Sequence, residues 1–346
     1  MLSKVEAVKE KILSEIKAGK FKSGMIIPSR HQLMKKYSCS RGSIDTAIGG
    51  LSKKGILYSH QGKGTFVAEK KVETALVKVF IVGDYSQNLR DESWRSTPLA
   101  AEIQQLLPCL HIHRNDININ LHKLVHPGSA VIWMRPSYSE LRVMDYLASA
   151  GIPQLLIGRN FGDYDHVRTD AESGIATGLE WLTENSGDEI VYISELNNPD
   201  RPFIAERHLA FYSKCIEMNI ALKPKNIFIR DFITLNTGQT VSQIAENLLA
   251  RPRFPKAIFI SFIAAAMPFV TFLEAKGKFS GRDYHLLTFD QDMWLMKHDG
   301  IGMIRQDWAK MDELACEWIL QKIKGKKEKF QKKIKPEFIV KEQKNG

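Results

Sequence analysis

From Val77 onward, the sequence alternates short apolar runs rich in β-branched residues with longer segments of helical periodicity. Alternation of this kind produces parallel sheets that helices cover on both faces. It continues for about 270 residues, which is more than one doubly wound domain usually needs. We therefore predict a two-lobed α/β region, with strands at 77–82, 130–134, 154–158, 190–194, 227–229, 257–262 and 286–289 and helices near 97–107, 137–150, 172–185, 203–218, 237–250, 264–276 and 308–323.

Two lobes of this kind leave a cleft between them. In open α/β sheets, ligands bind outside the carboxyl ends of the strands, so we expect a ligand site in this cleft. The region should span residues 77–346, with one lobe formed by about 77–159 and 291–318 and the other by about 160–290 and 319–346.

The N-terminal part of the chain follows a different plan. A first amphipathic segment precedes two shorter helical segments, for which Ser29 and Ser40 are good N-caps. Two short strands then follow, joined by the glycine-rich loop 60–64. The order helix, helix, turn, helix, hairpin is typical of a winged helix-turn-helix, which we predict for residues 1–69, with a linker at 70–76.

Positive charge is concentrated at the two ends of the chain. Residues 1–71 carry 15 Lys and Arg against 5 Asp and Glu, so they hold an excess equal to the net charge of +10 of the whole chain. A small domain with this excess attracts a polyanion such as DNA. The lysine-rich segment 320–346 has two interpretations, a nucleic-acid contact or a solvated helix end followed by an edge strand.

Composition and motifs exclude several classes of protein. The hydrophobic and charged fractions, 44% and 25%, are those of a soluble globular protein, and no apolar run is long enough for a transmembrane helix. The charged, amphipathic N-terminus is unlike a secretory signal, and the four cysteines form no CxxC pair, so we expect a cytoplasmic protein. Because no phosphate-binding loop, nucleophile elbow or dinucleotide fingerprint is present, we expect neither an enzyme nor a cofactor.

One histidine-rich stretch leaves an alternative open. It contains Cys109, His111 and His113, followed by His122 and His126 at helical i, i+4 spacing. These residues could bind a metal, or they could be structural and surface histidines. The spacing fits no standard zinc finger, and we expect no metal.

Residues 5–67 resemble the GntR family of bacterial regulators. The resemblance rests on the segments 24–29 (GMIIPS), 38–44 (SCSRGSI) and 62–67 (GKGTFV), with Leu33, Leu51 and 55–57 between them. In that family, positions equivalent to Ser29, Ser40, Arg41 and Ser43 touch phosphates and bases, and the tip of the wing enters the minor groove. The resemblance therefore implies DNA binding, for which we expect contacts from Ser29, Arg30, His31, Ser40, Arg41, Ser43, Thr46, Gly62, Lys63, Gly64 and Thr65.

Physical chemistry agrees with these assignments. Arg41 would begin the third helix, where a guanidinium can bond guanine with two hydrogen bonds. Serines near helix starts can bind phosphate together with free backbone N–H groups. Two departures from the family concern the operator sequence. The family usually has Glu-Arg where this chain has Arg30 and His31, and a second arginine where it has Asp45, which repels phosphate but can accept from cytosine N4.

The C-terminal region resembles the effector domain of the lactose- and galactose-repressor family, which is related to periplasmic sugar-binding proteins. The stretches that carry this are 167–170 with Gly174 and Leu182, 190–194, Arg207 with Phe211, 256–259, 287–290 and 304–307. The similarity is good from about 150 to 320 and weak from 83 to 125. A GntR-like head joined to such a domain resembles the arabinose-repressor-like subgroup.

That resemblance implies a ligand site with a carboxylate and a guanidinium. The positions matching Arg207 and Asp290 bond ligand hydroxyls in the family, although the two could also form a structural ion pair. The aromatic residues Tyr85, Trp133 and Phe161 could stack on a sugar or simply pack. We expect the effector-binding residues to be Asp84, Tyr85, Arg159, Phe161, Arg207, Phe262 and Asp290.

The main departure lies at Phe262-Ile263, where the family commonly has Asn-Asp and uses the Asp for its ligand. This replacement indicates an altered or more apolar effector, or the loss of sensing. The whole sequence predicts a homodimeric DNA-binding regulator, a repressor controlled by a carbohydrate-like effector. The alternatives are a regulator with a non-sugar ligand or none, a sugar-binding protein without DNA function, and an enzyme built on the two-lobed fold.

Overall fold

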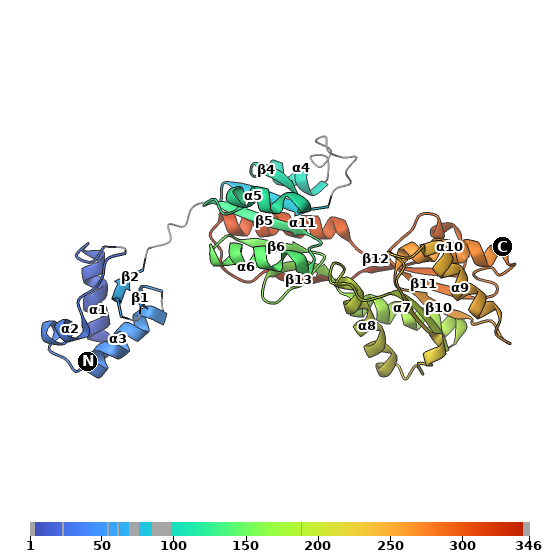
Figure 1. Ribbon diagram of the computed structural model, residues 1–346, viewed down its shortest axis with the longest axis horizontal. Helices are drawn as coiled ribbons and strands as arrows, with labels where there is room; N and C mark the ends of the chain where they lie inside the picture. The colour runs from blue at the N-terminus through green and yellow to red at the C-terminus, as the bar shows by residue number, and fades with distance from the viewer. Residues whose placement is uncertain are drawn as a thin grey trace. The chain divides into compact units, whose positions relative to one another are not determined.

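The computed structural model describes residues 4–22, 24–53, 55–60, 62–68, 76–84, 98–187 and 189–341. The chain divides into two compact units, Met1–Thr74 and Ala75–Gly346 (Figure 1). Most of the predicted linker lies outside the described residues. No helix in the described part of the chain is long and apolar enough to cross a membrane.

The first unit is the predicted winged helix-turn-helix. Its elements are α1 (Lys4–Lys17), α2 (Arg30–Tyr37), α3 (Arg41–Lys53), β1 (Leu57–His60) and β2 (Gly64–Val67). The strands pair in an antiparallel hairpin, with Leu57 opposite Val67. One apolar cluster holds all the elements together, because each helix turns its apolar stripe inward. It includes Val8, Ile12, Leu33, Ile44, Ile48, Leu51, Leu57 and Val67.

The second unit contains two six-stranded sheets, which define its two lobes. The sheet of the first lobe has the order β13-β7-β6-β5-β3-β4 and that of the second lobe β14-β12-β11-β10-β8-β9. All neighbouring strands are parallel except β12 and β14. The strands are β3 (Lys78–Gly83), β4 (Cys109–His113), β5 (Ser129–Met134), β6 (Gln154–Ile157), β7 (Asp165–Thr169), β8 (Ile190–Glu195), β9 (Ile227–Arg230), β10 (Ala257–Ile260), β11 (His285–Phe289), β12 (Ile301–Arg305), β13 (Gln331–Ile334) and β14 (Glu337–Val340).

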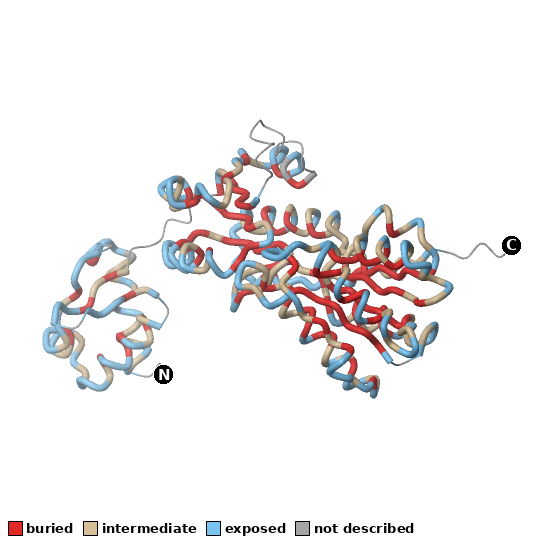
Figure 2. The backbone as a smooth tube through the Cα atoms, turned by 45° about the vertical axis from the view of Figure 1, so that its right-hand side comes forward, coloured by how far each residue is buried: buried red, intermediate tan, exposed pale blue. Residues whose placement is uncertain are grey.

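Helices cover both faces of each sheet, so the central strands are buried throughout (Figure 2). In the first lobe, α4 (Pro98–Gln104) and α11 (Trp308–Ile323) contribute to one apolar cluster, and α5 (Ile117–Leu124) and α6 (Leu141–Ser149) to another. In the second lobe, α7 (Ala171–Ser186) and α8 (Phe203–Glu217) share one cluster, and α9 (Thr237–Leu249) and α10 (Ile263–Ala275) share another. The predicted α/β architecture with two doubly wound lobes is confirmed.

The predicted division of the sequence between the lobes was wrong at its edges. Strand β7 belongs to the first lobe, although 160–290 was assigned to the second, and β12 belongs to the second lobe, although 291–318 was assigned to the first. Strand β13, predicted in the second lobe, pairs with β7 in the first. The chain therefore passes between the lobes after β7, after β12 and after β13. Sheet membership depends on pairing between distant segments, which periodicity does not reveal.

Several short elements were not predicted. Strands β4, β7 and β12 contain His, Asp, Arg or Gly, which interrupt the apolar runs used to find strands. The lysine-rich C-terminal segment forms the end of α11 and the strands β13 and β14, each at the edge of a sheet. It therefore has the form of a solvated helix end followed by edge strands.

A half-buried carboxyl group on α11 gives a pH-dependent prediction. Burial, together with the charge of Glu102, raises the pKa of Asp312 to about 6. Because the folded-state pKa lies above the unfolded value, this group stabilises the fold only when protonated, and its contribution is lost as pH rises from about 4 to about 6. Asp312→Asn should therefore increase the free energy of unfolding by about 1 kcal/mol at about pH 8 and much less at about pH 4.5, as measured by urea denaturation.

The neighbouring substitution Glu313→Gln is the control, because Glu313 is exposed and pairs with Lys310. It should show no gain at either pH. An equal gain for Asp312→Asn at both pH values would contradict the prediction.

Candidate functional site

The N-terminal unit presents an exposed helix whose start is held by serine caps. The Ser40 hydroxyl accepts a hydrogen bond from the Ser43 backbone N–H at 3.3 Å and lies 3.0 Å from the Ser43 hydroxyl. Arg41, the first residue of α3, has a side chain that is 74% exposed. At α2, Ser29 and Gln32 form a capping box, in which each side chain bonds the backbone of the other. Both helix starts are thus fixed, with their polar groups near solvent.

Asp45 lies between the two arginines of this surface. One carboxylate oxygen is 2.5 Å from the Arg30 Nε, and the other is 3.8 Å from the Arg41 Nε. All three side chains are at least 42% exposed. Exposed pairs of this kind contribute little stability, so the carboxylate mainly orients the guanidinium groups and lowers the local positive charge.

Neutralising Asp45 should strengthen non-specific DNA binding. In Asp45→Asn, Arg30 and Arg41 lose their carboxylate partner and a charge that repels phosphate is removed, so affinity for unrelated duplex DNA should rise about three- to tenfold at low salt. Fluorescence anisotropy with labelled duplexes measures this change. Glu10→Gln is the matched control, because Glu10 is an exposed acid on α1. An unchanged affinity for Asp45→Asn would contradict the prediction.

The hairpin supplies a glycine-rich basic tip. Gly62 and Gly64 have φ of 76° and 113°, a backbone conformation that favours glycine, and they flank the exposed Lys63. Thr65, predicted to contact DNA, is only 5% exposed, and its hydroxyl lies 2.9 Å from that of Ser59. Its side chain supports the hairpin and does not face solvent. The remaining predicted DNA-contact residues are at least partly exposed: Ser29, Arg30, His31, Ser40, Arg41, Ser43, Thr46, Gly62, Lys63 and Gly64.

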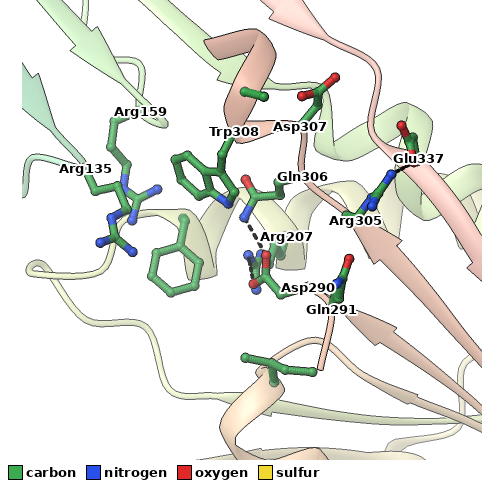
Figure 3. Close-up of a pocket in the computed structure, with 13 residues that line it drawn as sticks. Arg135, Arg159, Arg207, Asp290, Gln291, Arg305, Gln306, Asp307, Trp308 and Glu337 are labelled. Atoms are coloured by element: carbon green, nitrogen blue, oxygen red, sulfur yellow. Dashed lines mark hydrogen bonds and ion pairs between the residues drawn. The ribbon is translucent and has the colours of Figure 1, made fainter. Parts of the chain in front are cut away.

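The second unit contains a cavity of about 690 Å³ at the carboxyl ends of strands from both lobes (Figure 3). It lies where the chain passes between the lobes, because residues 305–309 and Glu337 line it. The other lining residues are Arg135, Arg159, Phe203, Arg207, Ile263, Asp290 and Gln291. Three predicted effector residues, Arg159, Arg207 and Asp290, are thus brought together.

Arg207 and Asp290 form an ion pair at 2.7 Å in this cavity. The Arg207 side chain is 7% exposed, donates a second bond to the Ser261 carbonyl at 2.7 Å, and lies 3.8 Å from the Phe289 ring centroid. Beneath it, the hydroxyls of Ser194 and Ser261 lie 2.6 Å apart. These buried contacts fix the orientation of the guanidinium, whereas the Asp290 side chain remains 27% exposed.

Gln306 connects Asp290 to the other lobe. Its amide nitrogen donates to the Asp290 carboxylate at 2.5 Å, and its amide oxygen accepts from the Thr169 hydroxyl at 2.6 Å. Thr169 ends β7 in the first lobe, and Asp290 follows β11 in the second. A change in the relative position of the lobes would therefore alter the contacts of the ligand-facing carboxylate.

Two residues that line the cavity have unusual backbone conformations. Among the described residues, four non-glycine residues have positive φ, and two of these, Arg135 (48°) and Asp290 (79°), line the cavity. The other two, Ser38 and Asn219, follow the ends of helices, where this conformation is common. Strained residues of this kind occur preferentially at ligand sites.

Three aromatic residues considered for ligand contact pack elsewhere. Phe161 is 5% exposed and packs against Tyr138, with ring centroids 5.0 Å apart. Phe262 stacks on Phe232 at 6.0 Å. Trp133 is 1% exposed and donates to Gln154. None of the three lines the cavity, where the aromatic rings are Phe203 and Trp308.

Asp84, also predicted to bind the effector, does not line the cavity. Asp84 is exposed and pairs with Arg114 at 2.8 Å. Tyr85 lies outside the described residues. The family resemblance is weak over residues 83–125, so it did not indicate which residues of this segment face the cavity. Conversely, Arg135 could have been found, because it directly follows a predicted strand of the first lobe.

The histidine-rich stretch shows no metal-binding cluster. Within the described ranges, no group of three or more His, Cys, Asp or Glu side chains is arranged to hold a metal ion. Burial, together with His113, lowers the pKa of His111 to about 4, so this imidazole is neutral.

The two units of the chain are similar to different groups of known proteins. Residues 4–67 match the family model described as "Bacterial regulatory proteins, gntR family". A segment of 72 residues, 21% of this chain, is 42% identical to the "Probable fructoselysine utilization operon transcriptional repressor" of Escherichia coli and covers 30% of that protein. A segment of 70 residues, 20% of this chain, is 40% identical to the "Arabinose metabolism transcriptional repressor" of Geobacillus stearothermophilus and covers 19% of it. The chain thus matches less than a third of the length of these relatives.

Solved structures share the fold of the larger unit. A LacI-family regulatory protein from Chloroflexus aggregans aligns with 76% of this chain and 97% of its own, at a TM-score of 0.63 and 16% identity. The structure titled "transcriptional regulator CelR-cellobiose complex" aligns with 87% of this chain and 90% of its own, at a TM-score of 0.59 and 15% identity. The chain therefore joins an N-terminal GntR helix-turn-helix domain to a two-lobed domain with the fold of LacI-family regulators.

Proposed function

We propose that this chain is a homodimeric transcription repressor. Its N-terminal unit binds operator DNA, and its two-lobed unit binds a small effector that changes DNA affinity. The observation that carries the proposal is the combination, in one chain, of a helix α3 with an exposed N-terminal end, a basic glycine-rich wing, and a cavity lined by charged side chains from both lobes. Both relatives are named as transcriptional repressors, which supports the direction of control.

The DNA-binding surface would use its two elements differently. The N-terminal end of α3 would enter the major groove, with Arg41 at base edges and the serines at phosphates. The wing tip would approach the backbone or the minor groove through Gly62 and Gly64, which leave room for close contact. Two copies would read a two-fold symmetric operator, which is the reason for proposing a homodimer.

Effector control would operate through the crossing segments. A ligand in the cavity contacts side chains of both lobes, so it favours the lobe positions in which these contacts are best. Gln306 bonds residues of both lobes, which couples the ligand-facing carboxylate to those positions. In a dimer, movement of one lobe would change the spacing of the two DNA-binding units. The effector class that the relatives support is carbohydrate-like, because one relative is named for arabinose metabolism and one similar structure is titled as a cellobiose complex.

Duplex binding by the full chain tests the proposal. We expect the chain to bind DNA from the region upstream of its own gene, with an affinity that falls steeply as salt rises, because exposed Lys and Arg neutralise phosphates. Fluorescence anisotropy over a salt series measures this dependence. If the full chain binds neither this region nor random duplexes with salt-sensitive affinity, the proposal fails.

A further inference from the structure

Within the part of the chain that the structure describes, some of the charged side chains that line the cavity between the lobes form ion pairs, and two arginines do not. Among its acidic side chains, Asp290 is paired with Arg207, Glu337 with Arg305, and Asp307 caps α11 by accepting from the Lys310 N–H at 2.8 Å. No carboxylate of the described residues forms an ion pair with the two other arginines that line the cavity, Arg135 and Arg159.

Arg159 forms no ion pair among the described residues, although the nearby carboxylates of Glu206 and Asp290 partly offset its charge. Its Nε is buried and has no hydrogen-bond partner among the described residues, while its Nη1 donates to the Gly158 carbonyl at 2.5 Å. Its guanidinium lies 4.6 Å from the Phe203 ring centroid, and that of Arg207 lies at the same distance from this ring. Burial and the neighbouring guanidinium groups of Arg207 and Arg135 lower the pKa of Arg159 to about 10, so it remains charged at neutral pH.

Arg135 adds a third guanidinium group to those of Arg159 and Arg207. Its guanidinium lies 5.6 Å from the Trp308 ring centroid, and Figure 3 shows it beside that of Arg159. Gly158 allows Arg135 and Trp308 to approach the backbone closely, since a Cβ there would lie 3.3 Å from the Arg135 side chain and 3.4 Å from the Trp308 ring. Such a concentration of like charges is unfavourable unless a ligand compensates it.

Helix starts add to the positive potential. The first residues of α8, α10 and α11, which are Phe203, Ile263 and Trp308, all line the cavity. Neither α8 nor α10 has a side-chain hydrogen bond at its N-cap. Helix N-termini carry partial positive charge and favour anions. The paired Asp290 and Gln306 remain able to bond hydroxyl groups in the same cavity.

We propose that the effector is an anionic polyol, a sugar carrying a phosphate or a carboxylate, whose oxyanion binds Arg135 and Arg159 while its hydroxyls bond Asp290 and Gln306. The inference rests on the proposed function, because it names the ligand class of the same cavity. It also accounts for an apolar residue at Ile263: a carboxylate there would oppose the oxyanion. The expectation of a more apolar effector does not fit a lining with four arginines.

Ligand titrations of the full chain test this inference. All six tryptophans lie beyond residue 74, and Trp308 lines the cavity, so intrinsic fluorescence reports binding in the second unit. Two matched sets, built on glucose and on ribose, each comprise the neutral sugar, its terminal phosphate ester and the acid with a terminal carboxylate; inorganic phosphate is added as a size-independent probe. We expect at least one charged member to bind at least tenfold more tightly than its neutral parent, and the better charged member identifies the oxyanion.

Variants separate ligand binding from folding. Arg159→Gln and Arg135→Gln should each weaken binding of the anion at least tenfold, while the unliganded protein unfolds at a temperature no lower than that of the wild type, because a crowded positive charge is removed. Arg142→Gln, at an exposed position on α6 outside the cavity, should bind the anion like the wild type.

Three outcomes would overturn the inference: neutral sugars that bind as tightly as their charged derivatives, no binding of any anion including inorganic phosphate, or full anion affinity in both cavity variants. Failure of the proposed function has a different signature. In that case the anion would still bind, but the chain would show no salt-sensitive affinity for duplex DNA.

Discussion

Arg41→Gln should lower affinity for operator DNA by about ten- to hundredfold, because a bidentate contact between arginine and guanine contributes about 1–3 kcal/mol. Arg41 begins α3, is 74% exposed and has only a loose contact of 3.8 Å with Asp45, so its guanidinium is free to rearrange on DNA. Fluorescence anisotropy on an operator selected by the wild-type chain from random duplexes measures the loss. The fold should be unaffected, because Arg41 packs against no core residue.

The salt dependence distinguishes two roles for Arg41. A base contact lowers affinity for the selected operator but not for unrelated duplexes, whereas a phosphate contact lowers both and reduces the salt slope by about 0.9. Lys53→Gln removes the same charge from the other end of α3 and should change affinity less than about threefold. Equal effects of Arg41→Gln and Lys53→Gln would show that α3 contributes only general charge.

Sequence patterns predicted the first unit almost completely, because its information is local. Caps such as Ser29 and Ser40 and the glycines of the hairpin act within a few residues of their own positions. The contact between Arg30 and Asp45 could not be predicted from the sequence, because these residues are 15 positions apart and meet only when α2 packs on α3. The same limit applies to Thr65, whose burial depends on its partner across the hairpin.

The lining of the cavity was predicted only in part. Arg207 and Asp290 were identified by family resemblance and Arg159 by its position at the end of a predicted strand, and all three line the cavity. Gln306 and Trp308 were not identified as ligand-facing residues, because they lie in a crossing segment whose position depends on which lobe each flanking element joins. Phe262 packs on Phe232, whereas the next residue, Ile263, lines the cavity. The sequence pattern did not distinguish these two neighbouring positions.

The ion pair between Arg207 and Asp290 supports the stability of the second unit as well as its site. Arg207→Met should lower the free energy of unfolding by about 2–4 kcal/mol, because it removes one partner of a largely buried pair and a hydrogen bond to the Ser261 carbonyl. We expect a loss in the lower half of this range, because Asp290 is 27% exposed and keeps its bond to Gln306. Urea denaturation followed by tryptophan fluorescence measures this unit alone.

A double-mutant cycle separates the pair from the rest of the site. Arg207→Met with Asp290→Asn should cost less than the sum of the two single substitutions, because no unpaired charge remains in the cavity. Arg230→Met, a matched loss of an exposed arginine on β9, should cost less than about 0.5 kcal/mol. DNA affinity without effector should be retained in Arg207→Met, since all contacts of Arg207 lie within the second unit, whereas the response of DNA affinity to effector should be lost. Additive effects in the cycle would mean that the two side chains act independently, and a retained response would remove Arg207 from the ligand site.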